Sequence, residues 1–162
     1  METNSRQKRI KTSKHFFFNL SQIENKIQSK TESIEKLINS SAPAGYKSNL
    51  RFQNTKIQET KRNYSVEATF GDVDKISKLK SDKEKLLNQY KCNSNLIDKV
   101  EDFYYRIFLQ CVFIFKLSKN EIKKILRAKQ IKTNNDFDNF LNDSLVSFSY
   151  VLENEYKKLK EA

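Results

Sequence analysis

Phe103-Tyr-Tyr-Arg-Ile-Phe-Leu-Gln-Cys-Val-Phe-Ile-Phe115 is the most apolar stretch of the chain, and only Arg106 and Gln110 interrupt it. With the apolar positions just upstream, it predicts one helix over about 96–117. That helix is apolar around much of its surface, so we expect it to be the central helix of the core. Each large side chain buried there contributes about 1.5–3 kcal/mol. The stretch is shorter than the ~20 residues that cross a bilayer, which favours a core helix over a membrane span.

Few residues in the chain favour tight turns: 162 residues include two Gly and one Pro. Sandwiches, barrels and propellers need many such turns, and a phosphate-binding loop needs several glycines. The composition therefore predicts an all-α protein, an elongated helical bundle. Its clearest break is Ser40–Gly45, which holds the single proline. We predict a basic, unstructured arm over 1–18, a front helix over 19–40, a basic linker over 41–70 and a helical domain over 71–162.

The front helix carries a narrow apolar seam. Its members repeat at heptad spacing, with Lys30 at one seam position, and they are Leu20, Ile23, Ile27, Ile34 and Leu37. A second helix is predicted to begin near Asp72, as its N-cap, with a similar seam. The two seams predict that these two coiled-coil-like front helices each pair with another helix, either in the same chain or in another.

The net charge of +11 lies mainly at the front, where residues 1–62 hold 13 basic and 5 acidic side chains. Such an excess favours an acidic partner, most often nucleic acid, although the codon usage of an AT-rich genome also produces lysine-rich chains. In the arm, Lys11 and Lys14 are further candidates for phosphate contact, and the alternatives for the arm are a nuclear import signal in a eukaryote or a solvated tail. The main nucleic-acid-binding candidates are Arg6, Lys8, Arg9, Lys119, Lys123, Lys124, Arg127, Lys129 and Lys132. Secondary basic contacts are Lys47, Arg51, Lys56, Lys61 and Arg62.

The C-terminal part has the layout of a helix-turn-helix over about 118–150. Ser118-Lys-Asn-Glu121 has the form of a capping box, a short basic helix follows, and a turn leads to a helix over about 135–160. The run Phe108–Leu126, with Ile23–Lys30 and Asp72–Lys80, resembles small phage-encoded transcriptional regulators of the ArpU/RinA type. The resemblance implies duplex DNA as the partner and a role in transcription regulation.

The helix that would read DNA departs from this pattern. It carries Asp136, Asp138 and Asp143 in its first turns, and it has no Lys or Arg before Lys157. Carboxylates repel phosphate, whereas recognition helices normally present Arg, Lys, Asn or Gln. Either the DNA-binding face is the preceding basic helix together with the arm, or the hairpin is degenerate and purely structural.

The sequence favours a non-enzymatic, intracellular binding protein. His15 is the only histidine, and Cys92 and Cys111 form no metal or redox motif, so we expect no catalytic site, no metal and no cofactor. The compartment is the cytoplasm in a prokaryote or phage-infected cell, or the nucleus in a eukaryote. We expect a nucleic-acid-binding regulatory protein. The alternative is a helical interaction protein, an assembly subunit or inhibitor. It would bind a helical partner or another copy of itself, and its basic front would dock on an acidic protein partner.

Overall fold

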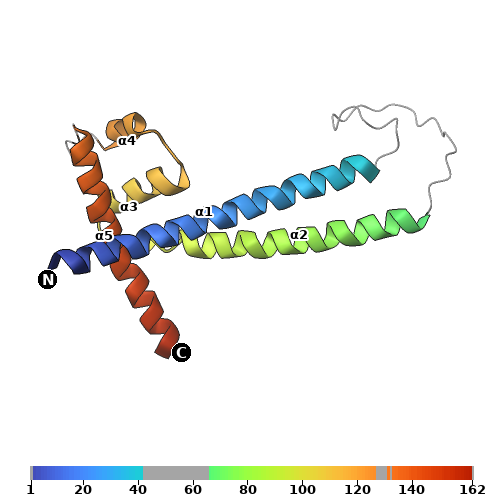
Figure 1. Ribbon diagram of the computed structural model, residues 1–162, viewed down its shortest axis with the longest axis horizontal. Helices are drawn as coiled ribbons and strands as arrows, with labels where there is room; N and C mark the ends of the chain where they lie inside the picture. Colours follow the sequence, from blue (N-terminus) through green and yellow to red (C-terminus); the bar gives the residue numbers. More distant parts are fainter. Residues whose placement is uncertain (1, 42–65, 127–130, 132, 162) are drawn as a thin grey trace. The chain divides into compact units, whose positions relative to one another are not determined.

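The computed structural model describes residues 2–41, 66–126, 131 and 133–161. Within these ranges the chain is helical and has no strand, which confirms the all-α prediction (Figure 1). The elements are α1 (Glu2–Ser41), α2 (Val66–Ser94), the 3-10 turn η1 (Ile97–Lys99), α3 (Phe103–Leu109), the π-helical turn η2 (Gln110–Ile114), α4 (Lys119–Ile125) and α5 (Asn134–Glu161).

The chain forms two compact units. The first, here called the bundle unit, contains Met1–Ile23 and Gln89–Ala162, and the second, the hairpin unit, contains Glu24–Asn88. This division differs from the predicted one, which assigned the helical domain to 71–162 and left 1–18 as an arm. The amino-terminal segment of α1 belongs to the bundle because its apolar face is part of the bundle core.

The amino-terminal segment of α1 is a helix, so the predicted unstructured arm over 1–18 is wrong. Phe17 and Leu20 are buried in the main core of the bundle unit, and Ile10 packs against that core. Ser13 is fully buried, and its hydroxyl donates a hydrogen bond to the Leu145 carbonyl at 2.7 Å. The low apolar content of this segment suggested disorder, but its few apolar residues share one helical face and become buried together.

The bundle core has two connected parts. In the first, Phe17 of α1 stacks on Phe113 with centroids 3.8 Å apart, beside the fully buried Phe148 of α5. The second joins α3, η2 and α4 to the start of α5, and its buried members are Phe108, Cys111, Ile122, Leu126, Ile131 and Phe137. Helix α5 therefore contacts both parts, with Leu141 bordering each of them.

The central helix predicted over 96–117 is interrupted. Val100 is extended (φ −67°, ψ 123°), and α3 begins after it. The Asp102 carboxylate caps α3 by accepting from the backbone N–H groups of Tyr104 and Tyr105, at 2.8 and 3.0 Å. An Asp side chain that satisfies free N–H groups stabilises a new helix start, and this local competition ends the preceding turn.

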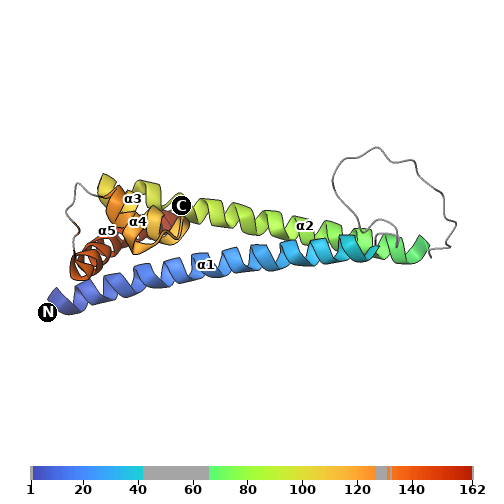
Figure 2. The ribbon, with the colours of Figure 1, turned by 90° about the horizontal axis from the view of Figure 1, so that it is seen from above.

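The hairpin unit pairs the rest of α1 with α2, which lie side by side in both views (Figures 1 and 2). Lys30 on α1 forms an ion pair with Asp82 on α2 at 3.0 Å, and this contact lowers the pKa of the Asp82 carboxyl. Ile34 is buried, while Ile27 and Leu37 are half-buried. The predicted seam is thus divided between the units: Leu20 lies in the bundle core, Ile23 is buried at the end of the bundle unit's segment of α1, and the later positions belong to the hairpin unit.

Two further sequence predictions concern the boundaries of α2 and the linker. Helix α2 begins at Val66, so Asp72 lies inside the helix and is not its N-cap. Asp72 instead pairs with Lys75, three residues later in the same helix, at 3.6 Å. The rest of the predicted linker, residues 42–65, lies outside the described residues.

Lys116 ends η2 in a left-handed conformation, with φ of 51°. The Leu117 N–H donates to the Cys111 carbonyl across this turn, at 2.9 Å, and closes the end of the helix. A left-handed residue with a side chain is less stable than glycine in that position. The capping box predicted at Ser118 follows at once and is present, with the Ser118 N–H donating to Glu121 at 2.8 Å.

We predict that Lys116→Gly stabilises the protein by about 0.5–1 kcal/mol, because glycine adopts positive φ without steric cost. Chemical denaturation followed by far-UV circular dichroism measures the change. Lys124→Gly, in the regular turn of α4, is the matched control and should destabilise by about 1 kcal/mol. Equal destabilisation by both substitutions would contradict the role given to the backbone at position 116.

Candidate nucleic-acid interface

The cations of the α1 amino-terminal segment divide between two faces of the helix. Arg6 and Arg9 share the side of the buried Ser13 and point toward α5, whereas Lys8, Lys11 and Lys14 are exposed on other sides. The sequence placed Arg6, Lys8 and Arg9 in one phosphate-contacting arm. In the helix they separate, and the arginines are used inside the molecule.

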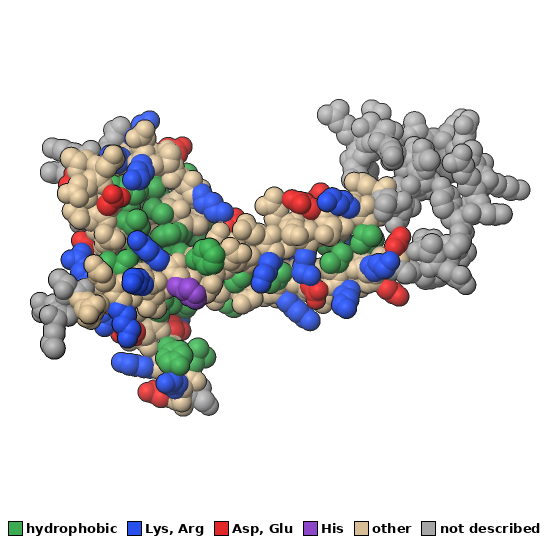
Figure 3. Space-filling view, viewed as in Figure 1, with side chains coloured by type: hydrophobic (Ala, Val, Ile, Leu, Met, Phe, Trp, Pro, Cys, Tyr) green, Lys and Arg blue, Asp and Glu red, His purple; other side chains and the backbone are tan. Residues whose placement is uncertain are grey.

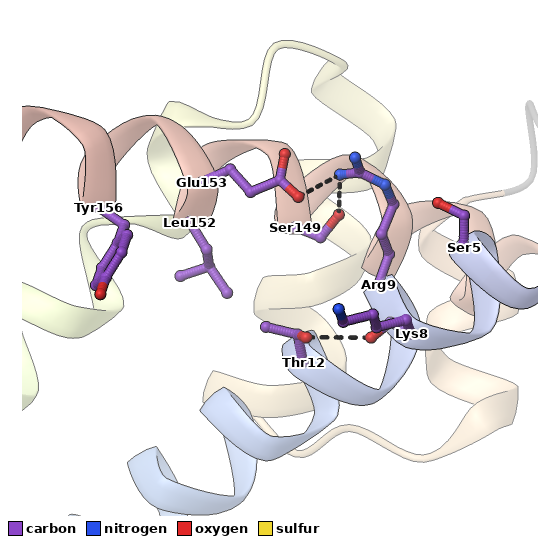
Figure 4. Close-up of a pocket in the computed structure, with 8 residues that line it drawn as sticks. All are labelled: Ser5, Lys8, Arg9, Thr12, Ser149, Leu152, Glu153 and Tyr156. Carbon is purple, nitrogen blue, oxygen red and sulfur yellow. Dashed lines mark hydrogen bonds and ion pairs between the residues drawn. The ribbon is translucent and has the colours of Figure 1, made fainter.

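Arg9 is the best-connected of these cations (Figure 4). One guanidinium nitrogen lies 2.8 Å from a carboxylate oxygen of Glu153 and donates to the Ser149 hydroxyl at 3.3 Å. The guanidinium carbon also lies 4.1 Å from the centroid of the Tyr150 ring. Arg6 forms an ion pair with Asp143, which lies six residues before Ser149 on α5. The two arginines therefore hold α1 to α5.

The carboxylates of α5 are largely neutralised inside the bundle unit. Asp138 lies 3.5 Å from Lys119 of α4, and Glu155 lies 2.9 Å from Lys99 of η1. The Asp136 carboxylate accepts from the Thr133 N–H at 2.8 Å, and the Thr133 hydroxyl accepts from the Asp136 N–H. With the partners of Asp143 and Glu153, five carboxylates of this helix have intramolecular roles, which gives its acidity a structural explanation.

The lysines of α4 are partly engaged as well. Besides its pairing with Asp138, the Lys119 ammonium lies 5.0 Å from the Phe137 ring centroid. Lys123 donates to the Asn134 side chain at 3.5 Å, and Lys124 is exposed. The remaining predicted contacts, Arg127, Lys129, Lys132, Lys47, Arg51, Lys56, Lys61 and Arg62, lie outside the described residues. Residues 127–130 and 132 of the predicted helix-turn-helix are among those that the structure does not describe, so that motif stays a prediction.

Lys8, Lys11 and Lys14 form what we call the α1 lysine stripe. Their spacing of three residues places them on one broad outer face, beside His15 and the 60% exposed Phe18. No carboxylate among the described residues lies within ion-pair distance of the three ammonium groups. Figure 3 shows Lys and Arg side chains gathered near this end of α1. The stripe is therefore a group of three exposed cations for which the described part of the bundle unit provides no ion-pair partner.

Other kinds of site find little support in the described residues. They contain no group of three or more His, Cys, Asp or Glu placed to hold a metal ion. None of the helices among them combines the length and apolar character that crossing a membrane requires.

Comparison with protein families, with curated proteins and with solved structures finds no match for this chain.

We predict that Arg9→Ala destabilises the protein by about 1 kcal/mol, because it removes an ion pair, a hydrogen bond and a cation–π contact. Urea denaturation of the two single variants Arg9→Ala and Glu153→Ala and of the double variant measures their coupling, expected at about 0.5 kcal/mol. Lys8→Ala is the neighbouring control and should change stability by less than about 0.5 kcal/mol. Independent effects of Arg9 and Glu153 would contradict the pairing.

We predict that Glu155 contributes to acid sensitivity. Hydrogen bonds from Lys99 and Lys158 lower the pKa of this carboxyl below its ordinary 4.5. Its contribution to stability is therefore complete above that value and is lost as pH falls through the lowered pKa. Denaturation midpoints between about pH 6 and pH 3 should fall less steeply for Glu155→Gln than for the native protein. Glu101→Gln, at an exposed carboxylate, should leave the slope unchanged.

Proposed function

We propose that the protein is a nucleic-acid-binding regulatory protein that contacts the phosphates of duplex DNA through the α1 lysine stripe. The observation that carries the proposal is the contrast within one helix. The inward arginines of α1 are neutralised by α5, whereas the three outward lysines have no described carboxylate beside them. Over the full bundle-unit sequence, 18 Lys and Arg stand against 11 Asp and Glu, a net of +7.

The geometry of the stripe suits a phosphate backbone. Lys8 and Lys14 are six residues apart, a rise of about 9 Å along the helix. One DNA strand presents a phosphate about every 3.4 Å of helix axis, so the stripe spans between two and three of these phosphate intervals. Because α1 is already folded against the core, binding does not have to order this segment, in contrast to a disordered arm. Lys124 of α4 supplies a further exposed cation.

The test is duplex binding as a function of salt. A labelled 20-base-pair duplex is titrated with native protein and with the double variant Lys11→Gln/Lys14→Gln by fluorescence anisotropy. The native protein should show a linear loss of log affinity against log salt, and the variant slope should be smaller by about 1.8, because two phosphate contacts are lost.

The control pair is Lys36→Gln/Lys80→Gln, at exposed lysines of the hairpin unit, which should keep the native slope. Absence of binding at low salt, or equal slopes for the two double variants, would overturn the proposal.

A second candidate, a helical interaction protein, is favoured by the charge balance of the two paired helical segments of the hairpin unit. Residues 24–41 contain three Lys and three Glu, and residues 66–88 contain five Lys and five acidic residues. Paired helices without a charge excess attract no polyanion, but their mixed surface suits contact with another protein. Retained binding of a protein partner by a chain that binds no duplex would favour this candidate.

A further inference from the structure

A second exposed feature of the bundle unit is a groove between α1 and the last turns of α5. It encloses about 600 Å³, and its lining includes Lys8, Arg9, Thr12, Leu152, Glu153 and Tyr156 (Figure 4). The volume lies in the range of established binding pockets. The α1 side supplies mainly polar groups, and the α5 side supplies the apolar wall.

The apolar wall continues beyond the pocket along α5. Leu152, Tyr156 and Leu159 follow one another at spacings of four and three residues, so they share one helical face. The same face upstream carries the buried Leu145. Toward the C-terminus its exposure rises, since Tyr156 is 62% and Leu159 is 78% exposed. An exposed apolar face that continues from the core in this way is a candidate surface for contact with another protein.

Lys8 and Arg9 are the cations of the groove lining, Glu153 is its carboxylate, and Lys160 lies beside the ring of Tyr156. The single carboxylate of the lining, Glu153, is already paired with Arg9 at 2.8 Å. Lys8 stands exposed on the α1 side, and on the α5 side the Lys160 ammonium lies 4.8 Å from the Tyr156 ring centroid. An occupant that places carboxylates at the rim would therefore meet two cations and no free carboxylate of the lining.

We propose that this groove binds an acidic amphipathic helix of a partner protein. Two of its apolar side chains pack against Leu152, Tyr156 and Leu159, which span about 10 Å, and its carboxylates face Lys8 and Lys160. Helices recognised in grooves present anchors at the same spacings of three and four residues, which the α5 face matches. The two proposals share Lys8, but the groove needs neither Lys11 nor Lys14, so substitutions at those two lysines distinguish it from the binding of nucleic acid.

The probe is a fluorescein-labelled 18-residue helical peptide with Leu at positions i, i+3/i+4 and i+7 and Glu at the positions that flank the Leu stripe on both sides. Anisotropy titration with the full chain should give saturable binding. The double variant Tyr156→Ala/Leu159→Ser should weaken it at least tenfold. Phe103→Ala removes another exposed aromatic ring of the bundle unit, 60% exposed, and should leave the affinity unchanged. A peptide with Lys in place of Glu should not bind.

Several outcomes would overturn the proposal. They are equal affinity of the Tyr156→Ala/Leu159→Ser and Phe103→Ala proteins, lack of saturation below about 1 mM peptide, and equal binding of the Lys peptide. Sedimentation identifies a different occupant: a native dimer that the Tyr156→Ala/Leu159→Ser protein cannot form would assign the groove to a second copy of the chain. Circular dichroism of each variant establishes that it is folded. The Lys11→Gln/Lys14→Gln protein should bind the peptide normally even if duplex binding fails.

Discussion

The crossing of the α1 amino-terminal segment over α5 is the constraint on which the bundle unit depends. Small side chains make the close approach possible, since Ser13 and Ser144 are fully buried and Ser149 is nearly so. Buried hydroxyls are costly unless they are hydrogen-bonded. Ser13 donates across the crossing to Leu145, and Ser144 donates to the Phe140 carbonyl within α5, at 2.7 Å in both cases. Among the described residues, no buried side-chain nitrogen or oxygen atom is left without a hydrogen-bond partner.

Sequence patterns predicted correctly a helix cap and the bounds of α5, which depend on residues close together in the sequence. The capping box at Ser118 and Glu121 is present, and α5 extends over 134–161 where 135–160 was predicted. Both signals are local, because a cap and a helical period are complete within a few residues. The break before Asp102 was missed because its carboxylate competes with a strongly apolar helical pattern, and the pattern alone does not measure that competition.

The candidate site was harder to predict because contacts between distant parts of the chain decide which of its charged side chains are paired and which are exposed. Arg6 and Asp143 are separated by 137 positions in the chain, so no local pattern connects them. The sequence did hold a usable signal, since Ile10, Ser13 and Phe17 fall on one helical face. Had that face been assigned to the core, Arg9 would have pointed inward and Lys11 outward. The acidity of α5, which argued against a DNA-reading helix, then becomes the counterpart of those inward arginines.

The two cysteines differ in a way that has a practical consequence. Cys92 is exposed on α2, whereas Cys111 is buried in the second part of the core, where burial raises the pKa of its thiol. Only the thiolate attacks alkylating reagents. The folded protein therefore carries a natural single attachment point for a fluorophore or spin label at Cys92. A second adduct, at Cys111, forms only when the bundle opens. The rate at which Cys111 is modified therefore reports the opening of the core, and no engineered residue is needed.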